Sequence, residues 1–283
     1  MVPPAPVAGW KYSAYRILSG FAALFPSTKA ALHPHLPVAR VNTQGHPFVV
    51  TPTDNLCEYK MWKYKRILEP QSVALLQQEV RGKRALMYDL GANIGIFSVL
   101  IGEKMGPGSR ILCFEPNPEM AARLAGNLDL NNAGKIARIH QVALGPEAGE
   151  GNLSLDGKNL GASTLLGAGL DQNGAFKGLI RVPIRPLAEY VDTATNYDVV
   201  VMKVDIEGFE DQALLPFFDS VDAAFWPDAI LIETMHAHVW KTDLVAELAG
   251  RGYAIVATPE HNTFFRRAPG AAQAAKRSLS QRK

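Results

Sequence analysis

Short apolar runs alternate with amphipathic segments along the chain from residue 85 onward. The first run, 85–90, is followed at once by a turn with two glycines and a helix that we expect to stop at Gly106-Pro107-Gly108. The next runs, 110–114 and 137–144, flank a segment whose apolar residues recur every four positions. Buried strands that alternate with such helices are typical of a parallel sheet covered on both faces. The pattern therefore predicts an α/β fold with a doubly wound, mostly parallel sheet.

The second half of the chain continues this alternation. We expect strands at 198–204 and 228–233, helices after 209 and at 242–250, and a closing antiparallel pair at 253–258 and 263–266. Between the two halves, the glycine-rich stretch 145–178 carries no helical period. Connections of that length are usually functional or mobile, so we expect a hairpin with a mobile loop there.

Residues 1–84 do not fit the alternation, and we expect them to form an N-terminal extension that packs on the domain. Early prolines predict a loose start, 13–25 an amphipathic helix and 48–50 a strand. Docking of this helix on the domain is favoured over a peripheral contact with a membrane, which stays open as the alternative. The expected organisation is this extension, a cofactor-binding domain at 85–267 and a basic, disordered tail at 268–283.

Composition narrows the class of protein. Hydrophobic residues make up 47% of the 283 residues and charged residues 20%, which excludes a wholly disordered chain and a collagen-like repeat. The two cysteines, Cys57 and Cys113, give neither a disulfide framework nor a metal motif. The longest apolar stretch near the N-terminus, 17–25, is far shorter than the roughly 20 residues that span a bilayer. We therefore expect no transmembrane segment and a cytoplasmic location.

Charge is unevenly distributed along the chain, whose formal net charge is +2. Six basic residues and no acidic residue lie in the last 18 positions: Arg266, Arg267, Lys276, Arg277, Arg282 and Lys283. Without them, 23 basic and 27 acidic residues leave a net charge of −4. A body of negative charge does not favour binding along a phosphate backbone, so nucleic acid is not the expected partner.

The turn at 89–95, Asp-Leu-Gly-Ala-Asn-Ile-Gly, joins the first strand to the first helix, where backbone N–H groups face ligands in such folds. The dinucleotide fingerprint G-x-G-x-x-G is absent, because no glycine stands between Gly91 and Gly95. Glu115 follows Gly91 by 24 residues, close to the spacing at which an acidic residue binds both ribose hydroxyls. Asp89 adds negative charge where a cationic sulfonium would lie. These features favour S-adenosylmethionine over NAD.

Three segments together closely resemble the FkbM family of S-adenosylmethionine-dependent methyltransferases: 89–95, 114–118 (Phe-Glu-Pro-Asn-Pro) and 203–210 (Lys-Val-Asp-Ile-Glu-Gly-Phe-Glu). The third segment is the most specific. The resemblance implies the seven-stranded, Rossmann-like sheet of class I methyltransferases and methyl transfer usually to oxygen. It also implies acceptors that are often sugars, polysaccharide units or natural products, although relatives vary at 145–187, where we expect the acceptor to bind. We expect the cofactor to be bound by Asp89, Gly91, Asn93, Gly95, Glu115, Pro116, Asn117 and Ala143.

A hydroxyl acceptor needs a base that takes its proton. Four titratable residues follow the last two parallel strands, and we expect them to converge because ligands bind at that edge of the sheet: Asp205, Glu207, Glu233 and His236. His236 is the leading base, because an imidazole with an ordinary pKa near ~6.5 accepts a proton at neutral pH without burial. The alternative is a surface or capping histidine. Asp205, turned inward, and Glu207 complete the expected catalytic group.

Three further expectations concern the same strand ends. Asp205 and Glu233 could hold Mg²⁺ and lower the pKa of the acceptor, or they could only bind the acceptor or cap a helix. Lys203 needs a partner inside its apolar strand, and Glu207 or Glu233 could supply it. A side chain introduced at Gly91 is expected to fill the space of the cofactor while the fold persists.

The leading hypothesis is a methyltransferase that acts on a hydroxyl of a small molecule or glycan. An NAD(P)-dependent oxidoreductase of Rossmann type is the main alternative, and the missing fingerprint glycine argues against it. An RNA methyltransferase is supported only by the basic tail. A nonenzymatic nucleotide-fold protein is disfavoured by the full set of acidic residues at the strand ends.

Overall fold

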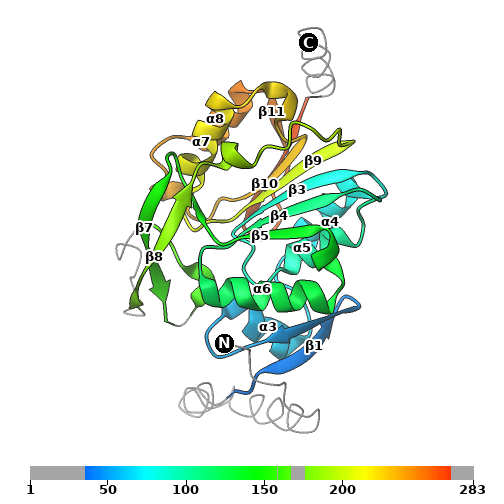
Figure 1. Ribbon diagram of the computed structural model, residues 1–283, viewed down its shortest axis with the longest axis vertical. Coiled ribbons are helices and arrows are strands. Elements are labelled where there is room, and N and C mark those ends of the chain that lie inside the picture. The colour runs from blue at the N-terminus through cyan, green and yellow to red at the C-terminus, as the bar shows by residue number, and fades with distance from the viewer. Residues whose placement is uncertain (1–35, 158, 167–175, 269–283) are drawn as a thin grey trace.

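A computed structural model of the chain describes residues 36–157, 159–166 and 176–268. At its centre lies a seven-stranded sheet (Figure 1). Its strands are β3 (Ala85–Leu90), β4 (Arg110–Phe114), β5 (Ala137–His140), β9 (Val199–Val204), β10 (Ala229–Glu233), β11 (Tyr253–Ala257) and β12 (Asn262–Arg267). They follow the order β11-β12-β10-β9-β3-β4-β5, in which the five strands from β10 to β5 are parallel and β12 is antiparallel to both neighbours. The expected mostly parallel, seven-stranded α/β sheet is confirmed.

Alternate side chains of the central strand β3 face two separate cores. Ala85 and Met87 pack in one core, whereas Leu86, Tyr88 and Leu90 pack in the other. Every residue of β3 and β9 is buried, as expected for strands in the middle of a parallel sheet with both faces covered. The first core also contains α4 (Pro70–Val80), α5 (Ile96–Gly102) and α6 (Pro118–Leu130), and the second contains α7 (Glu210–Ser220) and α8 (Leu244–Gly250). Helix α5 thus ends before the expected stop at 106–108.

A small sheet accounts for much of the glycine-rich stretch. It is formed by β6 (Ala143–Leu144), β7 (Gly149–Asp156) and β8 (Phe176–Arg185), and β7 and β8 pair as an antiparallel hairpin. The expectation of one strand at 137–144 is wrong. After β5 the chain leaves the main sheet, and Ala143 and Leu144 pair with β8 instead. Ala137 and Ile139 of β5 pack against the first core, whereas Ala143 and Leu144 pack in two other clusters. The hydrophobic pattern alone does not separate the two parts. Residues 167–175, in the stretch where a mobile loop was expected, lie outside the described residues.

The described part of the N-terminal extension packs against the main sheet. It contains β1 (Ala39–Thr43), β2 (His46–Val50), α3 (Leu56–Tyr64) and α4. The expected strand at 48–50 lies within β2, but neither helix was expected. Val73 and Leu76 of α4 join the first core, so this region supplies interior packing. The expected helix at 13–25 lies outside the described residues.

Two of the six basic residues near the C-terminus belong to β12. Arg266 forms an ion pair with Glu79 of α4, and Nη1 of the buried Arg267 donates to the carbonyl oxygen of Ala223. These two charges therefore belong to the folded domain. The described helices include none that is long and apolar enough to cross a bilayer. Short 3₁₀ helices complete the fold: η2 (Ala133–Lys135), η3 (Leu160–Ala162), η5 (Leu187–Tyr190), η6 (Ala223–Phe225) and η7 (Ala237–Val239).

Candidate active site

An open cleft lies at the carboxyl ends of β3, β4 and β9, with about 600 Å³ of space including its opening to solvent. Its walls come from the turn at Gly91, from Glu115 after β4, from 205–207 after β9 and from the segment 160–165. Ligands of open parallel sheets bind at this edge, where the sequence predicts the cofactor.

The turn at Gly91 touches the end of β9. Gly91 has φ 73°, and its N–H and that of Ala92 both donate to the carbonyl oxygen of Phe114 at 3.0 Å. A Cβ atom at Gly91 would lie 1.7 Å from the carbonyl oxygen of Asp205. The neighbour of Gly91 is therefore backbone, and the expectation that the fold tolerates a side chain here is not supported. Glycine is required both by φ and by this contact.

Glu115 is the buried carboxylate of the cleft, with 7% of its surface exposed. Its Oε2 accepts from the N–H of Asn93 and its Oε1 from the N–H of Asn117, both at 2.9 Å. Each carboxylate oxygen has a second lone pair, so the group can still accept from two hydroxyls. Burial raises the pKa of Glu115 to about 7, and the two backbone hydrogen bonds oppose this rise.

Five of the eight expected cofactor residues line the cleft: Gly91, Asn93, Glu115, Pro116 and Ala143. The other three lie behind it. Asn117 is the N-cap of α6, and Gly95 is the N-cap of α5 with φ 89°. Asp89 is fully buried, and its Oδ2 accepts from Ser98 Oγ at 2.5 Å. These three residues therefore shape the turn and the helix ends around the cleft.

Lys203 connects the turn at Gly91 with the end of β9. Its Nζ donates to the carbonyl oxygens of Leu90 and Gly91, at 3.3 and 2.6 Å. The same Nζ lies 3.3 Å from Oδ2 of Asp205 and 3.9 Å from Oδ1 of Asp89. One buried ammonium thus binds both backbone and carboxylates at the base of the cleft.

These contacts correct the expected pairing of Lys203. Its partners are Asp89 and Asp205, whereas Glu207 pairs with His236. Burial would lower the pKa of Lys203, but the charges of Asp205 and Asp89 raise it above its ordinary value. The ammonium therefore stays charged.

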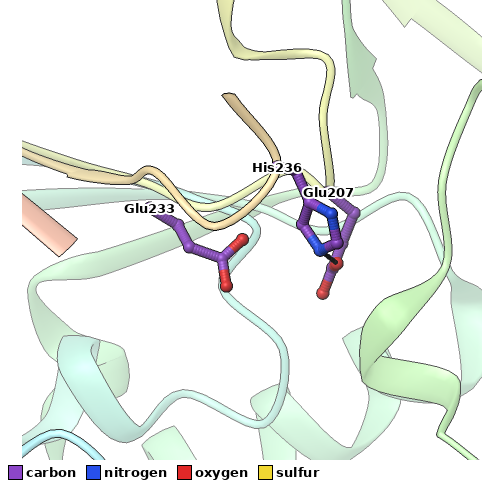
Figure 2. A group of neighbouring side chains, drawn as sticks. All are labelled: Glu207, Glu233 and His236. Atoms are coloured by element: carbon purple, nitrogen blue, oxygen red, sulfur yellow. Dashed lines mark ion pairs between the residues drawn. The ribbon is translucent and has the colours of Figure 1, made fainter. Parts of the chain in front are cut away.

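Glu207, Glu233 and His236 gather at the ends of β9 and β10 (Figure 2). Nε2 of His236 lies 3.2 Å from Oε2 of Glu207, and one potential ligand atom from each of the three side chains lies within 4.8 Å of the others. The side chains of His236 and Glu207 are 23% and 18% exposed, and Nδ1 of His236 is buried with no hydrogen-bond partner among the described residues. Three of the four residues expected to converge do so, and Asp205 lies instead beside Lys203.

The backbone of Glu207 is held by Thr164, which belongs to the segment 160–165 on another wall of the cleft. Glu207 has φ 55°, a conformation that costs a residue with a side chain roughly 1–2 kcal/mol. Oγ1 of Thr164 donates to its carbonyl oxygen at 2.7 Å, and Glu207 and Ser163 both line the cleft. Strain held by such contacts occurs often at functional sites.

Proton affinity differs among the three side chains. The hydrogen bond to Glu207 raises the pKa of His236 above its ordinary value. Burial raises the pKa of Glu207, and the hydrogen bond from His236 opposes this rise. Burial also raises the pKa of Glu233, to which the charge of Asp205 adds. With Glu233 neutral, one carboxylate faces one imidazole, and this pair can hold a proton taken from an acceptor.

The cluster does not fit the magnesium ion considered from the sequence. Magnesium prefers oxygen ligands in octahedral geometry, whereas one of the three potential ligands here is an imidazole. Asp205, one of the two expected ligands, is already paired with the ammonium of Lys203. A magnesium site at Asp205 and Glu233 is therefore not supported.

Asn55 supports the site through Asn93, a role that the sequence did not predict. It is 1% exposed, its Oδ1 caps α3 by accepting from the N–H of Glu58, and its Nδ2 donates to Oδ1 of Asn93 at 2.9 Å. Asn93 in turn donates its N–H to Glu115. An asparagine before an apolar run signals a helix cap, but that signal says nothing of the contact with Asn93.

The segment 159–166 crosses from the N-terminal region to the end of β9. Leu160 donates its N–H to the carbonyl oxygen of Asp54 at 2.7 Å, and a Cβ at Gly161 would lie 2.5 Å from Nδ2 of Asn93. At its other end, Thr164 binds Glu207. This segment therefore forms a wall of the cleft that also contains Gly91.

Asn55→Ser should weaken cofactor binding about fivefold, since a lost hydrogen bond costs ~1 kcal/mol. Serine is as good an N-cap as asparagine but too short to reach Asn93, so α3 keeps its cap while Asn93 loses its support. Calorimetry measures the affinity, and thermal unfolding shows whether the cap is kept. Asn55→Ala serves as the control that loses both functions. Wild-type affinity in the serine variant would show that Asn55 only caps the helix.

Comparison with known proteins gives one family. The model of the methyltransferase FkbM domain matches residues 89–266. "Methyltransferase sdnD" of Sordaria araneosa is 27% identical over 194 residues, which cover 59% of this chain and 73% of that protein. The solved structure of methyltransferase FkbM from Methylobacillus flagellatus KT is 17% identical with a TM-score of 0.43, covering 77% of this chain and 62% of that one. A methyltransferase from Geobacter sulfurreducens is 9% identical with a TM-score of 0.45, covering 75% and 86%.

Proposed function

The chain belongs to the FkbM methyltransferase family, and from this premise we propose that it transfers the methyl group of S-adenosylmethionine to a hydroxyl oxygen. The acceptor class we propose is a sugar, a polysaccharide unit or a hydroxylated natural product, methylated in the cytoplasm. S-adenosylmethionine supplies an electrophilic methyl group on a cationic sulfur. What the residues of this chain must do is bind the adenosyl group, align the acceptor and take its proton.

The observation that carries the proposal is the position of Glu115 in the cleft. A buried carboxylate held by two backbone N–H groups keeps free lone pairs toward the cleft, as a group that binds two ribose hydroxyls must. The adjoining turn at Gly91 lacks the middle glycine of the dinucleotide fingerprint, which lets a backbone approach a diphosphate closely. Both features support an adenosyl ligand without a diphosphate.

The proposed base is His236, positioned by Glu207. The imidazole is partly exposed, and the hydrogen bond from its Nε2 orients the ring toward Glu207, which lines the cleft. A proton taken from the acceptor hydroxyl would be stabilised on His236 by the charge of Glu207. The raised pKa of Glu233 favours its neutral form. The carboxylate of Glu207 is then the main negative charge next to the ring.

Glu115→Ala is expected to weaken S-adenosylmethionine binding tenfold or more. Charge-assisted hydrogen bonds contribute about 1.5–3 kcal/mol, and about 1.4 kcal/mol corresponds to a factor of ten. Calorimetric titrations with S-adenosylmethionine and with NAD test both the residue and the proposed function. Glu147→Ala, at an exposed glutamate outside the cleft, is the control. Binding of NAD in preference to S-adenosylmethionine would overturn the proposed function, and unchanged affinity would remove Glu115 from the site.

The same titrations give a pH test. Only the ionised carboxylate accepts from both ribose hydroxyls, and burial raises the pKa of Glu115 to about 7. Affinity should therefore be constant well above pH 7 and fall as pH drops through this value, by up to about tenfold per unit. The Glu115→Ala variant should lack this dependence.

A further inference from the structure

Glu210 is a buried carboxylate that the proposed mechanism does not use. It is the last residue of the segment 203–210, and it begins helix α7. Its side chain is fully buried. A buried charge is costly unless hydrogen bonds compensate for it, so the partners of this carboxylate indicate what it does.

One oxygen of Glu210 holds the loop that follows β9. Its Oε1 accepts from the N–H groups of Ile206 and Gly208, at 3.0 and 3.2 Å. These two residues stand on either side of Glu207, which has φ 55°, and Gly208 has φ 92°. Backbone N–H groups of a turn converge on anions in this way. The carboxylate of Glu210 therefore fixes the loop that presents Glu207.

The other oxygen of Glu210 holds the segment that carries His236. Its Oε2 accepts from Nε1 of Trp240 at 2.7 Å. His236 is the residue before η7 and Trp240 is the residue after it. Within this short helix, the N–H of Val239 donates to the carbonyl oxygen of His236 at 3.0 Å. The indole therefore ties one end of η7 to Glu210, and the imidazole lies at the other end.

The start of α7 is a suitable support for both loops. Negative charge is favourable at the N-terminus of a helix. Asp211, the next residue, is also buried, and its Oδ2 accepts from the N–H groups of Lys241 and Thr242 at 2.7 and 3.2 Å. Two adjacent carboxylates thus bind the segment after η7, but Glu210 also binds the loop around Glu207.

The pKa of His236 reports whether this arrangement is kept. The titratable groups around its ring are four carboxyl groups and one imidazole: Asp205, Glu207, Glu210, Glu233 and His238. The hydrogen bond to Glu207 contributes most to the raised pKa of His236, and the neighbouring negative charges add to it. A small separation of the two side chains would therefore lower this pKa.

We propose that Glu210 is a positioning residue, whose two carboxylate oxygens hold Glu207 and His236 at the distance of their hydrogen bond (Figure 2). This inference rests on the proposed function, in which His236 is the base. A base that is already in place when the acceptor binds needs no reorganisation during proton transfer. The segment 203–210 would then contribute to the site through its last residue as well as through Glu207.

Trp240→Phe tests the proposal, because it removes the indole N–H but keeps an aromatic ring and the charge of Glu210. We expect turnover of a hydroxylated acceptor to fall roughly tenfold to a hundredfold, with cofactor affinity within about twofold of wild type. NMR titration of ¹³C-labelled histidine rings should show the pKa of His236 shifted toward its ordinary value of ~6.5. The spectrum of the His236→Ala protein assigns the signal.

Two further variants complete the test. Trp226→Phe is the matched control, since Nε1 of Trp226 donates to the carbonyl oxygen of Val221 at 2.8 Å and its ring also packs against the second core. It should change neither the turnover nor the pKa of His236. Glu210→Gln keeps one acceptor oxygen, which cannot serve both loops, and removes a negative charge. In this variant the pKa of His236 should fall further than in Trp240→Phe.

The other results each decide against one statement. If Trp240→Phe leaves the pKa of His236 unchanged, the pair does not depend on Glu210 and the inference fails, whatever the turnover. The inference also fails if Trp226→Phe produces the same losses, because the cause is then a general loosening of the core. If the wild type methylates no acceptor, the proposed function fails. The titration still decides the inference in that case, since a lower pKa limited to Trp240→Phe and Glu210→Gln would support the positioning of the pair.

Discussion

Replacing His236 by alanine is expected to lower turnover roughly 10²–10⁴-fold and to leave cofactor affinity within about twofold of wild type. The imidazole lies beside Glu207 and Glu233, away from Glu115, so its loss removes the proposed base without touching the adenosyl site. Steady-state rates on a panel of hydroxylated acceptors, with S-adenosylhomocysteine formation as readout, measure the effect. His238→Ala is a matched control, because that exposed ring lies 6.2 Å from the ring of His236.

The pH dependence distinguishes a base from a structural residue. A base acts in its neutral form, so the rate should rise with pH through the pKa of His236. The hydrogen bond to Glu207 raises this pKa, and the midpoint should therefore lie above the ordinary value of ~6.5. Glu207→Gln removes the negative charge and should move the midpoint to lower pH. Wild-type turnover and an unchanged pH profile in the His236→Ala protein would exclude His236 as the base and direct the search to the segment 145–187.

Gly91→Ala is expected to reduce the free energy of unfolding by more than about 3 kcal/mol and to abolish cofactor binding. The added Cβ would lie 1.7 Å from the carbonyl oxygen of Asp205, so β3 and β9 would have to separate at the base of the cleft. Gly82→Ala provides a matched control. Gly82 has φ 69°, close to the 73° of Gly91, but a Cβ there would meet nothing within 4 Å. Its cost should be that of the left-handed conformation alone, about 1–2 kcal/mol.

Urea unfolding of the two variants separates conformational strain from steric conflict. Equal losses in the Gly82 and Gly91 variants would mean that the contact with Asp205 relaxes at little cost. A stable Gly91→Ala protein that also binds S-adenosylmethionine normally would rule out the turn as part of the site. A large loss limited to the Gly91 variant would support the close contact between the turn and β9.

The parts of the site that follow strand ends were predictable from the sequence. β3 and β4 begin and end at the expected residues, because buried runs next to turn residues have clear limits. Glu115 lines the cleft and the residues at the ends of β9 and β10 converge, since parallel strands bring their carboxyl ends to one edge. The order of the elements alone fixes which residues reach this edge.

The remaining contacts depend on strand register and on segments without a periodic pattern. Asp89 lies directly beside Lys203 in the pairing of β3 with β9, and no sequence signal states this register. Asn55 and Glu69 lie in the N-terminal region, where prolines and short elements gave no sequence pattern that predicts α3 and α4. Their contacts with Asn93 and Asn262 cross 38 and 193 positions of the chain. Such contacts come from tertiary packing and not from local propensity.

The start of α4 is bound to the turn between β11 and β12, which has a consequence for the order of assembly during synthesis. The carboxylate of Glu260 accepts from the N–H groups of Gln71 and Ser72 and from Ser72 Oγ, across 188–189 positions. Closing so long a loop costs conformational entropy before its contacts are gained. A chain that leaves the ribosome N-terminus first cannot make these bonds until Glu260 has emerged. The start of α4 is therefore fixed late, after β3 and β4, the strands before and after Gly91, have become available to pair.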